Sequence, residues 1–516
     1  MRPLALALVA LLLAGCAAPG GAPDDGDGGI APGDTSWAAR AVPSHDAHRH
    51  DDPAQHAGLT TPNFQVVGWE PLVSDAFGAT PGGYFCGGAG EAGDGRRLAV
   101  VHSYHAHTDV AFIVVDVTDP AAPAKLGEYI LERSHIYDAT ISLDGRFAVL
   151  GANPELPDAP FRGLPRVVQP KWRDACTGEV RPVGPEQALP LSPGVILVDL
   201  ADPTSPTFAD FAPTPALGPH SVHAGRADAA NVFLASITNL EHQASYFQFY
   251  GVRELPVLGP KLELLSTYQG PPGPSSPVPL INGHVDGYIA EHPVTKQTLA
   301  WLANWDAGMI VLDISNPRVP LEIARWGGAQ QGFRGAPATL GDENLGGIHG
   351  TYPLPVLWDD RHYTFAGQEI GGRPDNRPTG WIFIIDTTDP ANPTEVGRWT
   401  LPVDVNWSEF LQFSTHYFVV QGRTLFVSMY HGGVWAVDLE DEAALAEPRA
   451  VGVWVPDRVS PQPPGPEGRL STSDMVLDVV ALDETHLLSF GSRSGAYVLR
   501  FDPARPMPSP EPWRVE

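Results

Sequence analysis

A short phrase that recurs along the chain constrains the fold more than any other feature of the sequence. It first reads Ile-Val-Val-Asp-Val-Thr-Asp-Pro, and strong copies occupy 113–123, 196–206, 310–320 and 384–393. Weaker copies follow at 435–439 and 498–503. The apolar, β-branched run is typical of a strand, and the Asp-Pro or Asn-Pro that follows ends that strand in a turn. A phrase repeated in this way indicates a repeat fold built from similar units.

Further strands surround each copy of the phrase. One follows the second proline, at 126–130, 321–326, 396–400 and 451–454. A pair joined by a tight polar turn precedes the phrase, most clearly at 136–150 and 416–429. Helical periodicity is not convincing in any segment. Four antiparallel strands per unit predict an all-β chain in which each unit is one blade of a β-propeller.

The number of blades depends on two less regular segments. The distance from Asp199 to Asp313 is too long for one unit, and strands expected at 221–225, 231–237, 246–252 and 262–268 fill it without the phrase. This gives seven units, although six or eight blades stay open. The last unit has only three strands, and 64–69 has the pattern of an outer strand. We therefore expect this N-terminal strand to close the ring and remove its free edges.

The phrases resemble those of the LVIVD-repeat family of bacterial and archaeal surface proteins. The resemblance extends over 62–504 and implies a β-propeller, but it implies little about function. Segment 304–317 is also faintly similar to a blade of the selenium-binding/methanethiol oxidase propellers.

The N-terminus predicts export. Residues 1–15 combine a basic start with an apolar run too short to span a bilayer, which is typical of a signal peptide. Leu-Ala-Gly before Cys16 resembles a lipobox, so we expect Cys16 to carry a lipid and to anchor the protein at the cell envelope. An ordinary signal peptide is the alternative. Ala17 and Ala18 are not acidic, which favours the outer membrane.

Composition divides the remaining chain and excludes one class of partner. The Gly-, Pro-, Asp- and His-rich segment 16–61 cannot bury a core, so we expect a disordered tether, and 505–516 is expected to be a C-terminal tail. The net charge of −28 argues against nucleic acid, because phosphate binding requires clusters of Lys and Arg. We expect a monomer that meets the membrane only through its anchor.

Only two cysteines follow Cys16. In an oxidising compartment Cys86 and Cys176 predict one disulfide rather than a catalytic thiol, with a free thiol as the alternative. Such a bond would fix the insertion at 151–193 over the mouth of the propeller. The other long insertions, at 269–283, 327–347 and 456–473, are expected on the same face.

Histidines recur at one register of the repeat. In a propeller, the innermost strand of each blade starts at one mouth of the central channel, and the loop between the second and third strands returns to that mouth. The predicted starts of the inner strands carry His135, His220, His223, His284, His349, His416 and Asp474. The loops add the secondary candidates His105, His107, Asp306 and His431.

Two functions are consistent with this pattern. In the first, the chain is a binding module that presents its mouth to an envelope protein, peptide or glycan. In the second, the imidazoles bind one transition-metal ion (Cu, Fe or Zn) in an enzyme, an oxidoreductase rather than a hydrolase, with Asp138 and Asp286 orienting the rings. The sequence lacks the Gly-x-Ser-x-Gly, P-loop and His-Glu-x-x-His motifs.

A structural role is the alternative for each of these histidines, in which the imidazole is hydrogen-bonded to the backbone of a neighbouring blade. The spacing of the rings distinguishes the two roles. Rings more than about 8 Å apart could not share one ion, because metal–ligand distances are near 2 Å.

Overall fold

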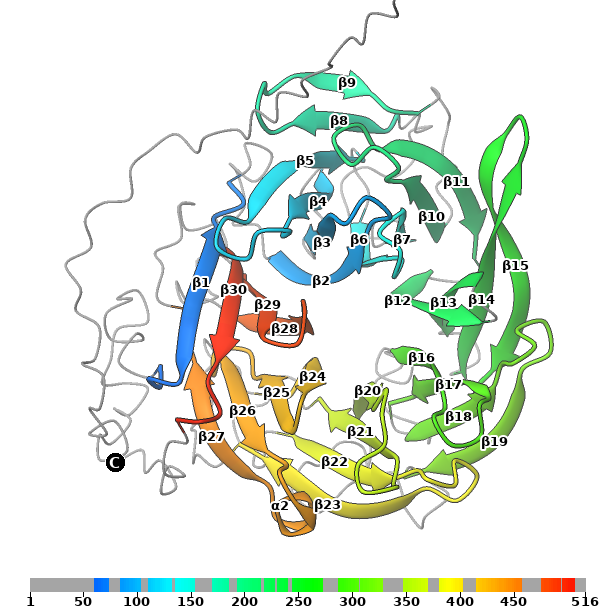
Figure 1. Cartoon of the computed structure of the whole chain (residues 1–516). Coiled ribbons are helices and arrows are strands. Elements are labelled where there is room, and N and C mark those ends of the chain that lie inside the picture. The colour runs from blue at the N-terminus through cyan, green and yellow to red at the C-terminus, as the bar shows by residue number, and fades with distance from the viewer. Residues whose placement is uncertain are drawn as a thin grey trace, which may run out of the picture.

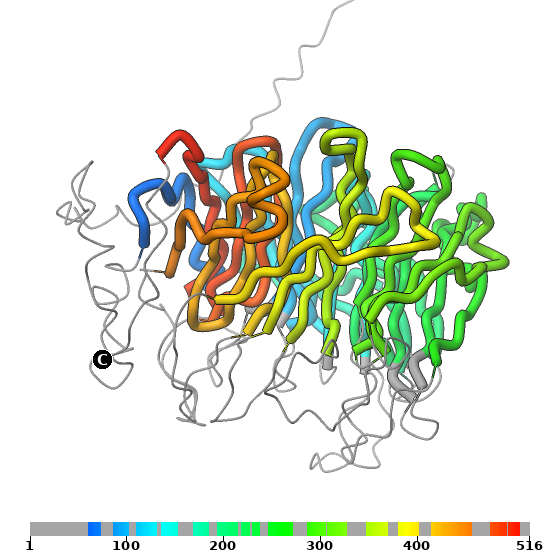
Figure 2. Tube along the Cα trace, turned by 90° about the horizontal axis from the view of Figure 1, so that it is seen from below, coloured from blue at the N-terminus to red at the C-terminus, as the bar shows by residue number. Residues whose placement is uncertain are grey.

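A computed structural model describes residues 60–73, 84–103, 110–131, 135–153, 169–184, 193–214, 218–227, 230–239, 244–271, 286–305, 307–327, 347–369, 380–401, 414–456, 475–492 and 494–505. Its strands form seven antiparallel sheets arranged in a ring (Figure 1). Seen from the side, the strands cross the thickness of a disc (Figure 2). The predicted seven-bladed β-propeller is confirmed.

Each blade is ordered from an inner to an outer strand. Blade one is β2 (Tyr84–Glu91), β3 (Arg97–Ser103), β4 (Val110–Asp116) and β5 (Ala124–Ile130); blade two is β6 (His135–Ile141), β7 (Phe147–Asn153), β10 (Gly194–Asp199) and β11 (Thr207–Pro213). Blade three is β12 (Pro219–Ala227), β13 (Ala230–Asn239), β14 (Ala244–Leu255) and β15 (Gly259–Gln269); blade four is β16 (Gly287–Glu291), β17 (Thr298–Ala303), β18 (Met309–Asp313) and β19 (Leu321–Trp326).

The remaining blades follow the same order. Blade five is β20 (Ile348–Pro353), β21 (Tyr363–Gln368), β22 (Trp381–Asp386) and β23 (Thr394–Thr400). Blade six is β24 (Phe418–Gln421), β25 (Thr424–Ser428), β26 (Val434–Asp438) and β27 (Arg449–Trp454), with the short helix α2 (Glu442–Ala446) before β27. Blade seven is β28 (Val476–Ala481), β29 (His486–Gly491), β30 (Gly495–Phe501) and β1 (Phe64–Glu70).

The recurring phrase forms the third strand of a blade and the turn after it. In β4, β10, β18 and β22 nearly every residue is buried, as expected for strands covered by neighbouring blades on both faces. The Asp that ends each strand accepts a backbone N–H two residues on, as Asp116 does from Thr118 at 2.9 Å and Asp313 from Ser315 at 2.9 Å. The repeated Asp therefore fixes a turn through its side chain.

The N-terminal strand closes the ring as predicted. β1 pairs antiparallel with β30, from Phe64 opposite Phe501 to Glu70 opposite Ala496. The residues just before β1 also bind blade six, because Asn63 donates to the carbonyl of Val451 at 2.8 Å. Closure therefore joins blades six and seven and leaves no free edge on β30.

Blade one differs from the expectation. The strands β8 (Lys171–Asp174) and β9 (Val180–Pro182) extend its sheet beyond β5, with Trp172 opposite Tyr129. Trp172 is fully buried there. This part of the 151–193 insertion therefore lies on the outer rim rather than over the mouth (Figure 1).

The predicted disulfide between Cys86 and Cys176 is wrong. Cys86 is a buried free thiol on the inner strand β2. Cys176 lies in the turn after β8, and four strand spacings separate β2 from β8. At about 4.8 Å per spacing the two strands are about 19 Å apart, far beyond disulfide reach.

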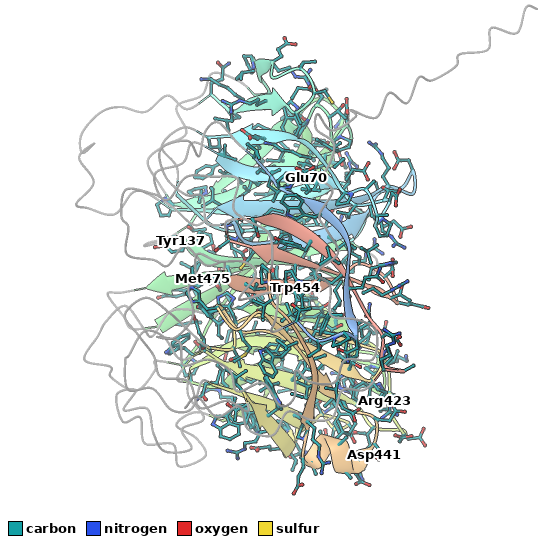
Figure 3. All side chains as sticks on the ribbon, turned by 90° about the vertical axis from the view of Figure 1, so that its left-hand side faces the viewer. Glu70, Tyr137, Arg423, Asp441, Trp454 and Met475 are labelled. Atoms are coloured by element: carbon teal, nitrogen blue, oxygen red, sulfur yellow. The ribbon has the colours of Figure 1, made fainter. Side chains whose placement is uncertain are left out.

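The two faces of the disc differ in the residues they carry. Tyr137 and Met475, near the starts of inner strands, lie toward one face, whereas Arg423 and Asp441 lie toward the other (Figure 3). The first face, where inner strands begin and second strands end, is called the mouth below.

Within the described residues, no helix has the length and apolar character needed to span a bilayer.

Two buried histidines join blades four and five away from the mouth. His292 bonds through Nε2 to the carbonyl of Thr387 at 2.9 Å, and His362 bonds through Nε2 to the carbonyl of Leu354 at 2.8 Å. Their ring centroids are 4.5 Å apart. Burial, and secondarily the neighbouring His292, lowers the pKa of His362 from 6.5 to about 4.

This pair predicts a loss of stability in acid. Between the two pKa values the unfolded chain binds more protons at His362, so the free energy of unfolding falls as the pH decreases from 6.5 toward 4. We expect His362 to contribute a loss of about 2 kcal/mol between about pH 7 and about pH 5. Denaturant unfolding should therefore be less pH-dependent in His362→Asn than in the parent chain. Equal pH dependence in both chains would contradict the prediction.

Candidate metal centre at the mouth

Irregular pairing on the inner strands positions two of the predicted histidines. His220 lies between Pro219 and Ser221, where the register of β12 against β13 shifts. His349 lies between Ile348 and Gly350, where the register of β20 against β21 shifts in the same way. A β-bulge leaves one residue out of the hydrogen-bonded ladder and redirects its side chain. The rings of His220 and His349 are therefore not held to the regular alternation of side chains between the two faces of a strand.

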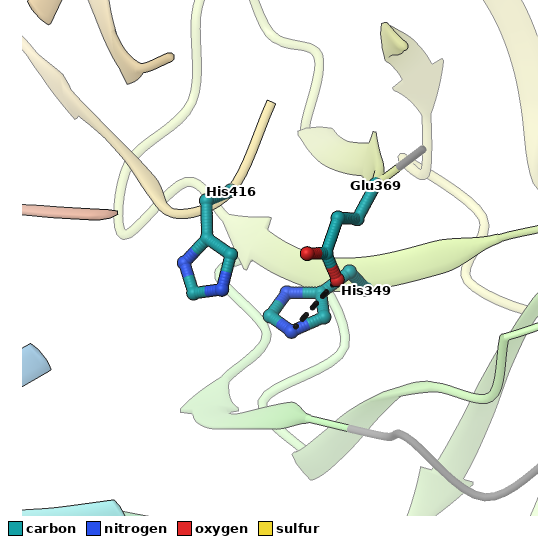
Figure 4. Close-up of side chains that lie close together, drawn as sticks. All are labelled: His349, Glu369 and His416. Atoms are coloured by element: carbon teal, nitrogen blue, oxygen red, sulfur yellow. Dashed lines mark ion pairs between the residues drawn. The ribbon is translucent and has the colours of Figure 1, made fainter. Parts of the chain in front are cut away.

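Three side chains from blades five and six converge at the mouth (Figure 4). One potential ligand atom each from His349, Glu369 and His416 lies within 4.8 Å of the other two. His349 Nε2 is 3.5 Å from Glu369 Oε2, and the rings of His349 and His416 are centred 4.4 Å apart. Within the described part of the chain, no other group of three His, Cys, Asp or Glu side chains meets this spacing. Two imidazoles and one carboxylate are a donor set suited to Zn or Fe.

Neighbouring blades orient two of these groups. His416 Nδ1 is 2.8 Å from the carbonyl of Leu477 in blade seven, and because a carbonyl only accepts, Nδ1 must donate. In the neutral ring Nε2 therefore keeps a lone pair for a metal. Burial, and secondarily His349, lowers the pKa of His416 to about 4. The second group is Glu369, which accepts a hydrogen bond from the hydroxyl of Tyr430 in blade six.

The structural role considered for these histidines is thus partly correct. His416 does bind the backbone of the next blade, but only through Nδ1. The ring of His220 in turn is centred 6.4 Å from that of His349 and nearly perpendicular to it. The rings of His416 and His220, centred 4.4 Å and 6.4 Å from that of His349, both lie within the limit of about 8 Å set for a shared site.

Glu369 is the member of the cluster that sequence reasoning missed. It lies six residues after Tyr363, which pairs with Asp386 of the repeated phrase. Trp305 and Tyr430 occupy the same position after Leu299 and Thr424, which pair with Asp313 and Asp438. Trp305 and Tyr430 are therefore the equivalents of Glu369 in blades four and six, and the predicted candidates Asp306 and His431 come directly after them. Comparison of the repeats could have identified Glu369.

The loops that carry Trp305 and Tyr430 share an unusual backbone. Both residues have positive φ, 41° and 51°, which is uncommon for large side chains. Each forms an isolated bridge to the inner strand of the next blade, Trp305 with Ile348 and Tyr430 with Val476. The rings consequently stand beside the cluster, 6.2 Å from His349 for Trp305 and 5.4 Å from His416 for Tyr430. Such strain is often retained at functional sites.

The other predicted ligands have separate positions. His223 packs its ring 4.4 Å from that of Tyr288, and burial lowers its pKa to about 4. His431 is buried in the loop between β25 and β26. His135 begins β6, but its side chain lies outside the described residues. Also outside them are His105, His107, His284, Asp306 and Asp474.

An inner ring of residues lies one position further along the inner strands. In each blade, the inner strand pairs with the second strand, and equivalent pairs of residues can be matched from blade to blade. Each member of the inner ring directly precedes the inner-strand residue of the same matched pair. The members are Cys86, Asp138, Ser221, Asp286, Gly350, Tyr417 and Asp478. Burial raises the pKa of Asp286, and burial together with Asp138 raises that of Asp478 to about 7. Three carboxyl groups at one register make this part of the propeller attractive to cations.

Asp138 was expected to orient the rings of the candidate histidine ligands, but its contacts indicate a different role. Its Oδ2 accepts the backbone N–H of Val222 in blade three at 2.9 Å, and its Oδ1 lies 3.3 Å from Nε2 of His102 in blade one. Asp478 similarly accepts the N–H of Gly87 from the next blade at 3.0 Å. These two carboxylates therefore join inner strands of adjacent blades.

The hydroxyl of Tyr430 allows a mild test of the cluster. Tyr430→Phe should lower the affinity for a transition metal by about tenfold, because it removes the donor that holds Glu369 while the ring stays packed. Calorimetric titration measures the change. Tyr497→Phe, which removes a hydroxyl bonded to Ser494 in blade seven, is the matched control and should bind as the parent does. Equal losses in both variants would count against a role for Glu369.

Comparison with known proteins bears on the fold. Residues 299–326, which contain β17, β18 and β19, match the LVIVD repeat family. The chain is a β-propeller that carries an LVIVD repeat. No curated protein matches the chain.

Solved structures offer only distant similarity. Two crystal structures of Sqt1 from Chaetomium thermophilum are 11% identical, with TM-scores of 0.43 and 0.42; each covers 85% of this chain, and the matches span 99% and 98% of those chains. A chain from a crystal structure of the Mitotic Checkpoint Complex is 11% identical with a TM-score of 0.44, covering 86% of this chain and 93% of that one. Similarity at this level carries no functional argument.

Proposed function

We propose that this chain is an exported, lipid-anchored envelope protein that binds one transition-metal ion at the mouth of its propeller. The observation that carries the proposal is the convergence of His349, Glu369 and His416 within 4.8 Å. Among the ligands that the sequence left open, a metal ion is the one for which the described residues supply a donor set.

Electrostatics and protonation support a cation at this place. A metal binds neutral imidazole, and the lowered pKa of His416 keeps that ring neutral well below neutral pH. The inner ring adds Asp138, Asp286 and Asp478 one position further along the inner strands. Burial raises the pKa values of Asp286 and Asp478, and a nearby cation would favour their charged forms.

Export and anchoring rest on the sequence of residues 1–61, most of which lies outside the described residues. A signal peptide followed by an acylated Cys16 would hold the propeller on a tether at the outer membrane. Mass spectrometry of protein extracted from membranes tests this part. A mature N-terminus at Cys16 with bound acyl chains is expected, and an unmodified residue 16 would refute the anchor.

Elemental analysis tests the metal site. The tether histidines (His45, His48, His50 and His56) are replaced by Ala in the full chain, which is purified without a histidine tag and equilibrated with Zn(II), Cu(II) or Fe(II). After removal of free metal we expect about one ion per chain for at least one of these metals. Amounts far below one ion per chain for all three would overturn the proposal.

A further inference from the structure

We infer that the bound metal keeps a coordination position open to a small anionic or oxygen-donor ligand, and that His220 faces this ligand without binding the metal. The inference rests on the proposed metal site and adds what that site binds. It concerns the side of the cluster on which His220 lies near His349.

The three ligands approach from one side. His349 belongs to β20, Glu369 follows β21 and His416 precedes β24, so all three come from blades five and six. A zinc ion requires four donors, and a site that supplies three from the protein leaves a position for water or another ligand. Among the described residues, no further His, Cys, Asp or Glu side chain joins this group within 4.8 Å.

His220 lies across from the cluster on blade three. Its ring is centred 6.4 Å from that of His349 at an interplanar angle of 85°, and 5.6 Å from that of Tyr137 in blade two. A metal–ligand bond of about 2 Å followed by a hydrogen bond of about 2.8 Å spans about 5 Å. The 6.4 Å between the ring centroids of His220 and His349 is of the same order as this span, which is why we place the small ligand between the metal and the His220 imidazole.

Glu369 and two aromatic rings define the surroundings of the cluster. The side chain of His349 is 3% exposed, whereas that of Glu369 is 15% exposed, so the carboxylate marks the edge of the buried region. Trp305 and Tyr417 lie against His349, with ring centroids at 6.2 Å and 5.2 Å. Aromatic side chains beside a few polar groups are typical of sites that bind small ligands.

Cobalt provides the spectroscopic test, with azide as the probe ligand. The full chain with its tether histidines replaced is loaded with Co(II), whose visible absorption reports coordination, and is titrated with azide. We expect azide to shift the spectrum in a saturable way. His220→Ala should weaken azide binding at least tenfold, because it removes a hydrogen bond to a charged ligand. The affinity for Co(II) should stay within about twofold of that of the parent chain.

The outcomes separate this inference from the proposed function. If Co(II) binds but azide leaves the spectrum unchanged, the metal is coordinatively saturated and only the inference fails. If His220→Ala abolishes Co(II) binding, His220 is a ligand and the inference also fails. If Co(II) does not bind, both fail. His486→Ala, on β29 and bonded to Asp483, is the control and should change neither affinity.

Discussion

Replacement of His349 by Ala should lower the affinity for a transition metal by more than about 100-fold, since a ligand is lost rather than a residue that orients one. His349 is the central member of the cluster, because its ring lies 4.4 Å from that of His416 and its Nε2 lies 3.5 Å from Glu369. Calorimetric titration of the full chain with its tether histidines replaced measures the loss.

A structural role for His349 predicts a different result. His349 is 3% exposed, so its removal could also loosen the contact between blades five and six. His349→Gln, which preserves bulk and hydrogen bonding, should remain folded and still lose the metal, and His486→Ala should retain it. A His349→Gln chain that binds metal as the parent does would show that the ring is not a ligand.

The second large effect concerns closure of the ring. Phe64→Ala should destabilise the protein by about 3–4 kcal/mol, the usual cost of removing a buried aromatic ring. Phe64 is 6% exposed and packs against Phe501 of blade seven and Phe426 of blade six, with ring centroids at 5.0 Å and 6.1 Å. Denaturant unfolding measures the loss.

The next residue in the same strand provides the control. Gln65 is exposed, so Gln65→Ala should change the free energy of unfolding by less than about 0.5 kcal/mol. If Phe64→Ala were as mild as Gln65→Ala, the N-terminal strand would contribute little to closure, and the packing between blades would have to hold the ring alone.

The fold was predictable because the phrase contains its own local physics. The apolar run specifies a strand covered on both faces, and the Asp that ends it fixes the turn, as at Asp313 and Ser315. Blade three lacks the phrase but retains four strand-like segments, and these form β12 to β15. The closing strand was recognisable because 64–69 has the pattern of an outer strand.

Features that depend on contacts distant in sequence were not predictable. The pairing of β8 with β5 depends on Trp172 packing beside Tyr129, and no local signal distinguishes it from a loop over the mouth. That pairing also separates Cys176 from Cys86. Glu369 was missed although its position in the repeat marks it. His349 was predicted, but the shift in strand register that frees its ring from regular alternation is not marked in the sequence.

Anomalous X-ray diffraction from crystals of the metal-loaded chain tests the central claim most directly. The account predicts one strong peak about 2 Å from imidazole nitrogens of His349 and His416 and from a carboxylate oxygen of Glu369. A peak elsewhere, or none at the mouth in crystals shown to contain the metal, would contradict it.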